Sequence, residues 1–206
     1  MAATKPKTDG RETRALTIPL ELRAAAADGA GTGTAAGYAA LFNVETDIGG
    51  YWIETIATGA FAKSLKERDC LAVHSHDIGR VVGRMRAGTL SLHEDDKGLA
   101  FECQLPDTTD GRDLAVQIER GDIAGMSFGF RSVRSEWDET VEPPKRTIME
   151  AELYEITFTP MPAYPDTEVG LRSLEGARQE RREHNKSAAG SRIARRMRLK
   201  QSERKF

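Results

Sequence analysis

Short apolar segments broken by Gly, Asp and Thr follow one another from Gly37 onward, and this pattern constrains the fold more than any other feature. Their spacing of roughly 8 to 15 residues is typical of strands in an antiparallel sheet or barrel. The segments are GYAALFNV, YWIETIA, LAVHSH, VVGRMR, GTLSLHED, GLAFECQL, GMSFGFRSV and RTIMEAELYEITFTP.

Two segments with helical periodicity interrupt the strands. In TGAFAKSLKER, Thr58 is a candidate N-cap, and the apolar residues Phe61 and Leu65 are four apart. In DTTDGRDLAVQIERGD, Asp110 is a candidate N-cap and Gly121 a helix terminator. The sequence therefore predicts an α+β fold that is mostly β, with a few helices beside an antiparallel sheet or barrel.

The chain of 206 residues, 39% of them hydrophobic, is long enough for one core of ordinary size. We expect a flexible segment over 1–36, with a possible first strand at Leu16–Leu22, an ordered domain over 37–172 and a flexible tail over 173–206. Residues 171–206 contain 12 Lys and Arg against 4 Asp and Glu, a net charge of +8 within a chain whose total is -2. Such a tail could bind an acidic partner, whereas the lack of interleaved aromatic residues makes nucleic acid an unfavoured one.

Composition also argues against several classes of protein. No apolar run is long enough to span a membrane, and the first residues lack the apolar core of a secretion signal. Cys70 and Cys103 are too few for a disulfide framework, which predicts reduced thiols in a cytosolic setting. No cofactor motif is recognised, so no cofactor is expected.

Histidine is scarce, which narrows the search for a catalytic base. His93 and His184 lie in polar surroundings and are expected at the surface. His74 and His76 are two apart, so they would share one face of a strand. With Asp77 they could contribute to a zinc site, but a further firm ligand is not evident. Alternatively, one of them is a general base for a serine nucleophile.

Ser127 is the candidate nucleophile because Gly125 and Gly129 flank it within an apolar run, GMSFGF. A buried serine bonded to the backbone would give the same pattern, so both interpretations stay open. Glu155 interrupts the apolar run AELYEITFTP and is the candidate acid that orients a histidine. An inward-facing carboxylate there would need a partner, although an outward-facing one would not.

The order of these motifs resembles the prohead proteases of HK97-like tailed phages over about residues 37–172. The matching segments are GYAALFNVETD, ETIATGAF, HSHDIGRVVGR, GTLSLHEDDKGLAFECQLPDT, GMSFGF and ELYEITFTPMPAYPDTEV. The resemblance implies a β-barrel surrounded by helices, related in fold to the herpesvirus assembly proteases. It also implies that residues 37–172 are a protease domain.

For the site, the resemblance implies Ser127 as nucleophile, His76 rather than His74 as base, and Glu155 as the third member. Backbone N–H groups near Ser127, or Arg84, are candidate oxyanion donors. The implied substrates are the scaffold portion of the major capsid protein and the protease itself, cut inside a procapsid in the bacterial cytoplasm. Dimerisation is a further expectation. The alternatives are a non-catalytic scaffold or assembly protein of the same fold, and a metal-dependent hydrolase that uses His74, His76 and Asp77.

Overall fold

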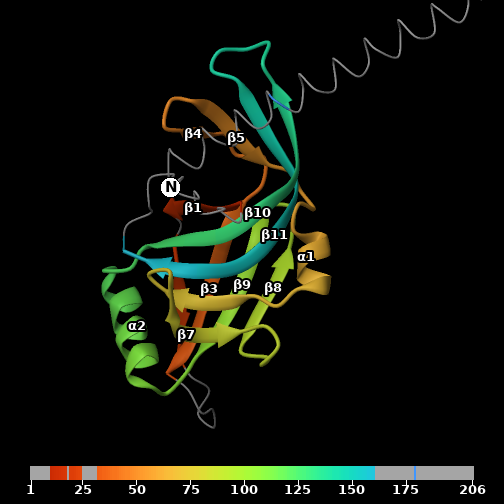
Figure 1. Ribbon diagram of the computed structural model, residues 1–206. Coiled ribbons are helices and arrows are strands. Elements are labelled where there is room, and N and C mark those ends of the chain that lie inside the picture. Colours follow the sequence, from red (N-terminus) through yellow and green to blue (C-terminus); the bar gives the residue numbers. More distant parts are fainter. Residues whose placement is uncertain (1–9, 18, 25–31, 161–178, 180–206) are drawn as a thin grey trace, which may run out of the picture. The chain divides into compact units, whose positions relative to one another are not determined.

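The computed structural model describes residues 10–17, 19–24, 32–160 and 179 (Figure 1). Residues 1–167 form one compact unit and residues 168–206 form a second. Apart from Gln179, the predicted tail 173–206 lies outside the described residues. The described part of the first unit contains eleven strands and two helices, so the mostly β, α+β prediction is confirmed.

Two long antiparallel strands form the centre of the larger, seven-stranded sheet: β10 (Gly125–Asp138) and β11 (Lys145–Thr159). On the far side of β10, β1 (Arg11–Thr17) pairs with it in antiparallel fashion. The first strand therefore begins five residues before the predicted Leu16–Leu22 and overlaps that range only at Leu16 and Thr17. Pro19, which has no N–H to donate, separates β1 from the next strand.

The other side of β11 carries two short hairpins. β5 (Trp52–Ile56) pairs in parallel with the first part of β11, and β4 (Thr46–Ile48) continues the sheet beside it. β6 (Leu71–His74) pairs in parallel with the last part of β11, and β7 (Asp77–Arg84) pairs with β6. This arrangement brings the His74–His76 region to the strand that carries Glu155.

The smaller sheet has four antiparallel strands in the order β2-β3-β9-β8. These are β2 (Glu21–Arg23), β3 (Gly33–Leu41), β9 (Gly98–Leu105) and β8 (Leu90–Glu94). The two sheets are not closed into one cylinder, so the predicted barrel is not confirmed.

The core lies between the sheets. Phe101 of β9 meets Phe158 of β11 edge-on, with ring centroids 5.7 Å apart. Phe128 of β10 meets Phe61 at 5.8 Å. All four rings are buried. Cys70 and Cys103 are buried free thiols in this core, and burial raises the pKa of Cys103 to about 12.

Both predicted helices form, but their predicted N-caps are wrong. α1 (Ala62–Glu67) begins after Phe61, because Gly59 is left-handed at φ +85° and keeps Thr58 out of the helix. Its first free N–H, that of Phe61, is bound by the carboxylate of Glu94 at 2.9 Å.

α2 (Thr109–Arg120) is capped by Thr108, whose hydroxyl accepts from the N–H of Gly111. Asp110 instead lies in the first turn and binds Arg80 at 2.9 Å. Gly121 ends the helix in the left-handed conformation, which confirms the predicted terminator.

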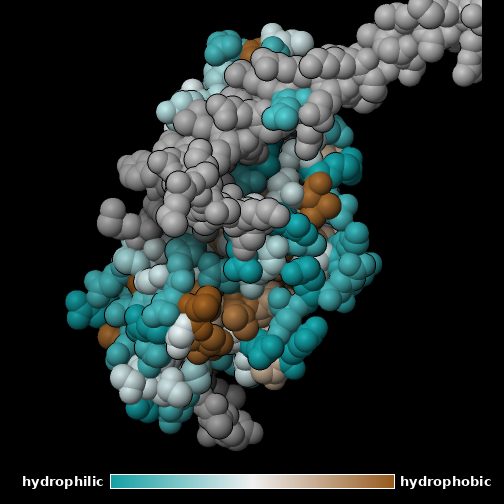
Figure 2. All heavy atoms as spheres, in the orientation of Figure 1, coloured by the Kyte–Doolittle hydropathy of each residue, from teal (hydrophilic) through white to brown (hydrophobic). Residues whose placement is uncertain are grey.

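Most of the surface seen in Figure 2 is hydrophilic, and the clearest exception is a compact apolar area over the position of β7. Ile78 and Val81 of β7 are 76% and 42% exposed. Neither helix α1 nor α2 is long and apolar enough to cross a membrane, and the rest of the described chain contains no such helix.

Candidate active site

Ser127 and Glu155 lie on the same face of the larger sheet. Ser127 is paired with Thr157 across the β10–β11 ladder, and Gly129 is paired with Glu155. Directly opposed residues share a face, and residues two apart along a strand share it too. These four residues therefore lie on the face opposite to Phe128 and the core.

The turn after β6 delivers His76 to this face. Ser75 and His76 are both left-handed, with φ values of 53° and 59°, and the N–H of Ser75 donates to the carbonyl of Phe158. Two consecutive non-glycine residues in this region are uncommon, and such strain concentrates at functional sites. The strand ends at His74, so the predicted shared face of His74 and His76 is wrong.

His76 and Glu155 form a short hydrogen bond. Nδ1 of His76 lies 2.6 Å from Oε1 of Glu155, and the two side chains are 31% and 14% exposed. An ionised carboxylate can only accept, so it pairs with an imidazole that is protonated at Nδ1, and in the neutral imidazole of that tautomer Nε2 keeps its lone pair. The pair therefore presents Nε2 as a base toward any proton donor placed beside it.

Ser127 has a different partner in this structure. Its side chain is fully buried, and Oγ donates to the backbone carbonyl of Arg14 in β1 at 2.8 Å. Among the described residues, no hydrogen bond joins Ser127 to His76. The structure thus brings His76 and Glu155 together and holds the Ser127 hydroxyl on β1, as the backbone-bonded interpretation of this serine expects.

His74 does not join the pair. It is 6% exposed, its Nδ1 has no hydrogen-bond partner among the described residues, and burial together with the charge of Arg80 lowers its pKa. Asp77 accepts from the N–H of Gly79 within its own turn. The described residues contain no group of three His, Cys, Asp or Glu side chains that could hold a metal ion.

Arg84, the candidate oxyanion donor, is already paired. Its Nε donates to Asp69 at 2.6 Å, and its side chain is 51% exposed. The oxyanion donors therefore stay a prediction.

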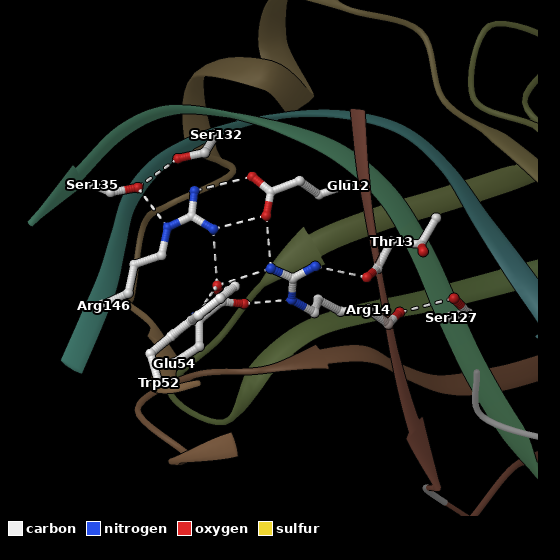
Figure 3. Close-up of polar contacts among 9 residues, drawn as sticks. All are labelled: Glu12, Thr13, Arg14, Trp52, Glu54, Ser127, Ser132, Ser135 and Arg146. Carbon is white, nitrogen blue, oxygen red and sulfur yellow. Dashed lines mark hydrogen bonds and ion pairs between the residues drawn. The ribbon is translucent and has the colours of Figure 1, made fainter. Parts of the chain in front are cut away.

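Beside Ser127, four charged side chains form a buried network: Glu12, Arg14, Glu54 and Arg146 (Figure 3). Arg14 binds Glu54 through Nε at 2.6 Å and Glu12 through Nη2 at 2.7 Å. Nη1 of Arg146 binds the same two carboxylates at 2.7 and 3.0 Å. Two positive and two negative groups balance, as buried charges require.

This network fixes β1 against β5 and β11, because its members come from all three strands. Arg14 links this network to Ser127. Its side chain is bound within the network, while its backbone carbonyl accepts a hydrogen bond from the Ser127 hydroxyl (Figure 3). Sequence reasoning missed these residues. Glu12 and Arg14 fall in the segment predicted to be flexible, and their partners on β5 and β11 are 40 and 134 positions away.

Residues 19–181 of the chain match the family of caudovirus prohead serine proteases. The chain belongs to this family. A stretch of 107 residues is 28% identical to the prohead protease of Escherichia phage T5, which covers 52% of this chain and 48% of that protein. The matched region thus spans about half the length of this prohead protease relative. No solved structure matches this family member.

Acid should destabilise this prohead protease family member through Glu12. Burial alone would raise the pKa of Glu12, but the hydrogen bonds and charges of Arg146 and Arg14 outweigh it and hold that pKa below its ordinary value. A lowered folded-state pKa contributes stability that is present above the unfolded value of about 4.3 and is lost as pH falls through the folded value. We expect the urea midpoint to fall on acidification below about pH 4.

The matched variants are Glu12→Gln and Glu136→Gln, whose native side chains are 6% and 66% exposed. Glu12→Gln should be less stable at pH 7 and lose less of its remaining stability on acidification. Glu136→Gln should show the same dependence of the urea midpoint on pH as the wild type. If the urea midpoints of all three proteins fall equally steeply with pH, Glu12 does not cause the acid sensitivity.

Proposed function

We propose that this chain is a serine endopeptidase of the phage procapsid, with Ser127 as nucleophile, His76 as general base and Glu155 as the orienting acid. The observation that carries the proposal is the 2.6 Å contact between His76 and Glu155 on the sheet face that also bears Ser127. Membership of the prohead serine protease family supports it.

In the proposed reaction, Ser127 Oγ attacks the carbonyl carbon of the scissile peptide while Nε2 of His76 takes the hydroxyl proton. Collapse of the tetrahedral intermediate breaks the C–N bond, and His76 gives its proton to the leaving amine. Water then hydrolyses the acyl-enzyme by the same transfers in reverse order. Glu155 stays ionised and stabilises the imidazolium.

The hydroxyl of Ser127 must leave the Arg14 carbonyl before it can donate to His76. Rotation about one side-chain bond changes its partner, and catalytic hydrogen bonds commonly tighten only once substrate is bound. The hydrogen bond to β1 therefore describes a resting state of the nucleophile in this proposal.

The proposed substrates are the scaffold portion of the major capsid protein and the chain itself, cleaved within procapsids assembled in the host cytoplasm. The resemblance to the prohead proteases of HK97-like tailed phages implies these targets, a homodimer and a fold related to the herpesvirus assembly proteases. A non-catalytic assembly protein is the second candidate, because Ser127 is fully buried and bonded to backbone.

The test compares the wild type with Ser127→Ala, each produced with the cognate capsid protein, by intact mass. We expect shortened capsid protein and shortened protease with the wild type only, and the same cleavage in the presence of a chelator. Full-length masses in both samples would favour the assembly protein. Cleavage that survives Ser127→Ala but stops with the chelator would favour the metal hydrolase.

A further inference from the structure

We propose that Gly129 and Thr157 are positioning residues that hold the carboxylate of Glu155 against His76, an inference that rests on the proposed serine protease function. Gly129 lies opposite Glu155 in the β10–β11 ladder, and Thr157 follows Glu155 on the same face of β11. Neither needs to touch the substrate to act, since both act through Glu155.

Gly129 leaves space for the side chain of Glu155, which a larger residue at this position would occupy. Its φ lies outside the left-handed region, so its backbone would accept another residue. A Cβ at this position, however, would lie 3.0 Å from Cγ and 3.1 Å from Oε1 of Glu155. Carbon atoms pack best at about 3.5 to 4.0 Å, so the carboxylate would have to move. The displaced oxygen is the one that binds His76.

Thr157 binds the second oxygen of the same carboxylate. Its Oγ1 donates to Oε2 of Glu155 at 3.2 Å, and its side chain is fully buried. With Oε1 on His76 and Oε2 on Thr157, both oxygens have a fixed partner, which restrains the terminal torsion of Glu155. The carboxylate is thus oriented before any substrate arrives.

This arrangement gives the second glycine of GMSFGF a role apart from the nucleophile. Ser127 is paired with Thr157, two residues along the ladder from the Gly129–Glu155 pair, so the two pairs are neighbours on one face. The four residues form a two-by-two block in which one diagonal holds nucleophile and acid, and the other holds Gly129 and Thr157. A glycine two residues after the serine is therefore needed because the acid lies across from it.

The kinetic test uses Gly129→Ala, Thr157→Val and Thr157→Ser, with Thr147→Val as matched control. Thr147 lies on the same strand and also loses a side-chain hydrogen bond, to Thr55 at 3.3 Å. We expect kcat/KM for capsid protein cleavage to fall roughly 10- to 100-fold in Gly129→Ala and about 5-fold in Thr157→Val. Thr157→Ser should restore most of the rate, and Thr147→Val should stay within about twofold of the wild type.

A second readout separates positioning from a general loss of structure. In a Ser127→Ala background, the Nδ1 proton of His76 should give a downfield NMR resonance that Glu155→Gln removes. Gly129→Ala and Thr157→Val should shift or broaden this resonance, while Thr157→Ser and Thr147→Val leave it in place. Urea midpoints measured on the same samples identify any variant that fails to fold. If Gly129→Ala does not fold, the comparison of Thr157→Val with Thr157→Ser decides whether the carboxylate is positioned in this way.

Rates within twofold of the wild type and an unchanged resonance, in folded Gly129→Ala and Thr157→Val, would overturn the inference. That outcome differs from failure of the proposed function, which would appear as cleavage by Ser127→Ala or as no cleavage by the wild type. The resonance reports on the position of the Glu155 carboxylate against His76 whether or not the protein cleaves capsid protein, because it does not depend on catalysis.

Discussion

Glu155→Gln is expected to lower kcat/KM by roughly 10⁴-fold while the protein stays folded, which is the size of effect seen when the acid of a serine protease triad becomes an amide. The loss has two physical sources. The amide can present its NH2 group to Nδ1 of His76, which would move the imidazole proton to Nε2 and leave no base for Ser127. It also removes the negative charge that stabilises the imidazolium formed in the reaction.

The measurement is the initial rate of capsid protein cleavage, with Glu150→Gln as the control. Glu150 lies on the same strand and pairs with Lys63 at 3.2 Å, but its side chain is 31% exposed. We expect Glu150→Gln to change the rate less than twofold. If Glu155→Gln keeps the rate within tenfold of the wild type, Glu155 does not orient the base, and the third member must be sought elsewhere.

The sequence allows Glu155 to be found because a carboxylate inside an apolar strand needs a partner. The structure supplies that partner, His76, at 2.6 Å. Which residue would partner it could not be derived locally, because the contact depends on the parallel pairing of β6 with β11. Parallel pairing between strands some 80 positions apart leaves no periodic signal in either strand.

The orientation of His76 and the two helix N-caps were predicted wrongly from the sequence for a different reason, which is local turn geometry. His76 reaches the site through a left-handed turn at Ser75 and His76, whereas the alternation of a strand predicts that His74 and His76 point the same way. Thr58 and Asp110 have the right residue types for N-caps, but a left-handed Gly59 and a better-placed Thr108 override them. Turn geometry decided each of these cases.

The buried network of Glu12, Arg14, Glu54 and Arg146 is the clearest example of a feature that the sequence does not predict. Glu12 and Arg14 alternate with polar neighbours in a segment rich in charge, a pattern that favours a solvated chain end. Their burial arises only because β1 adds to the edge of β10 and meets opposite charges on β5 and β11. Charge complementarity between distant strands is a tertiary property, and composition does not reveal it.

Arg146→Met should therefore destabilise the protein by about 3 to 5 kcal/mol, the usual result of breaking a buried ion pair from one side. Arg146 is 3% exposed and holds Glu12 through both terminal nitrogens, at 2.7 and 3.0 Å. Without it, two buried carboxylates share the single charge of Arg14. Urea unfolding measures the loss, in the Ser127→Ala background so that the proposed self-cleavage does not interfere.

Arg134→Met is the control for this loss. Arg134 is 59% exposed and pairs with Glu136 at 3.5 Å, so its removal should cost less than about 1 kcal/mol. Combining Arg146→Met with Glu12→Gln removes one charge of each sign and leaves Arg14 paired with Glu54. The double variant should lose less than the sum of the two single losses, because the charge imbalance is gone. Strictly additive losses, or a loss below about 1 kcal/mol for Arg146→Met, would mean that the network does not hold β1 by charge pairing.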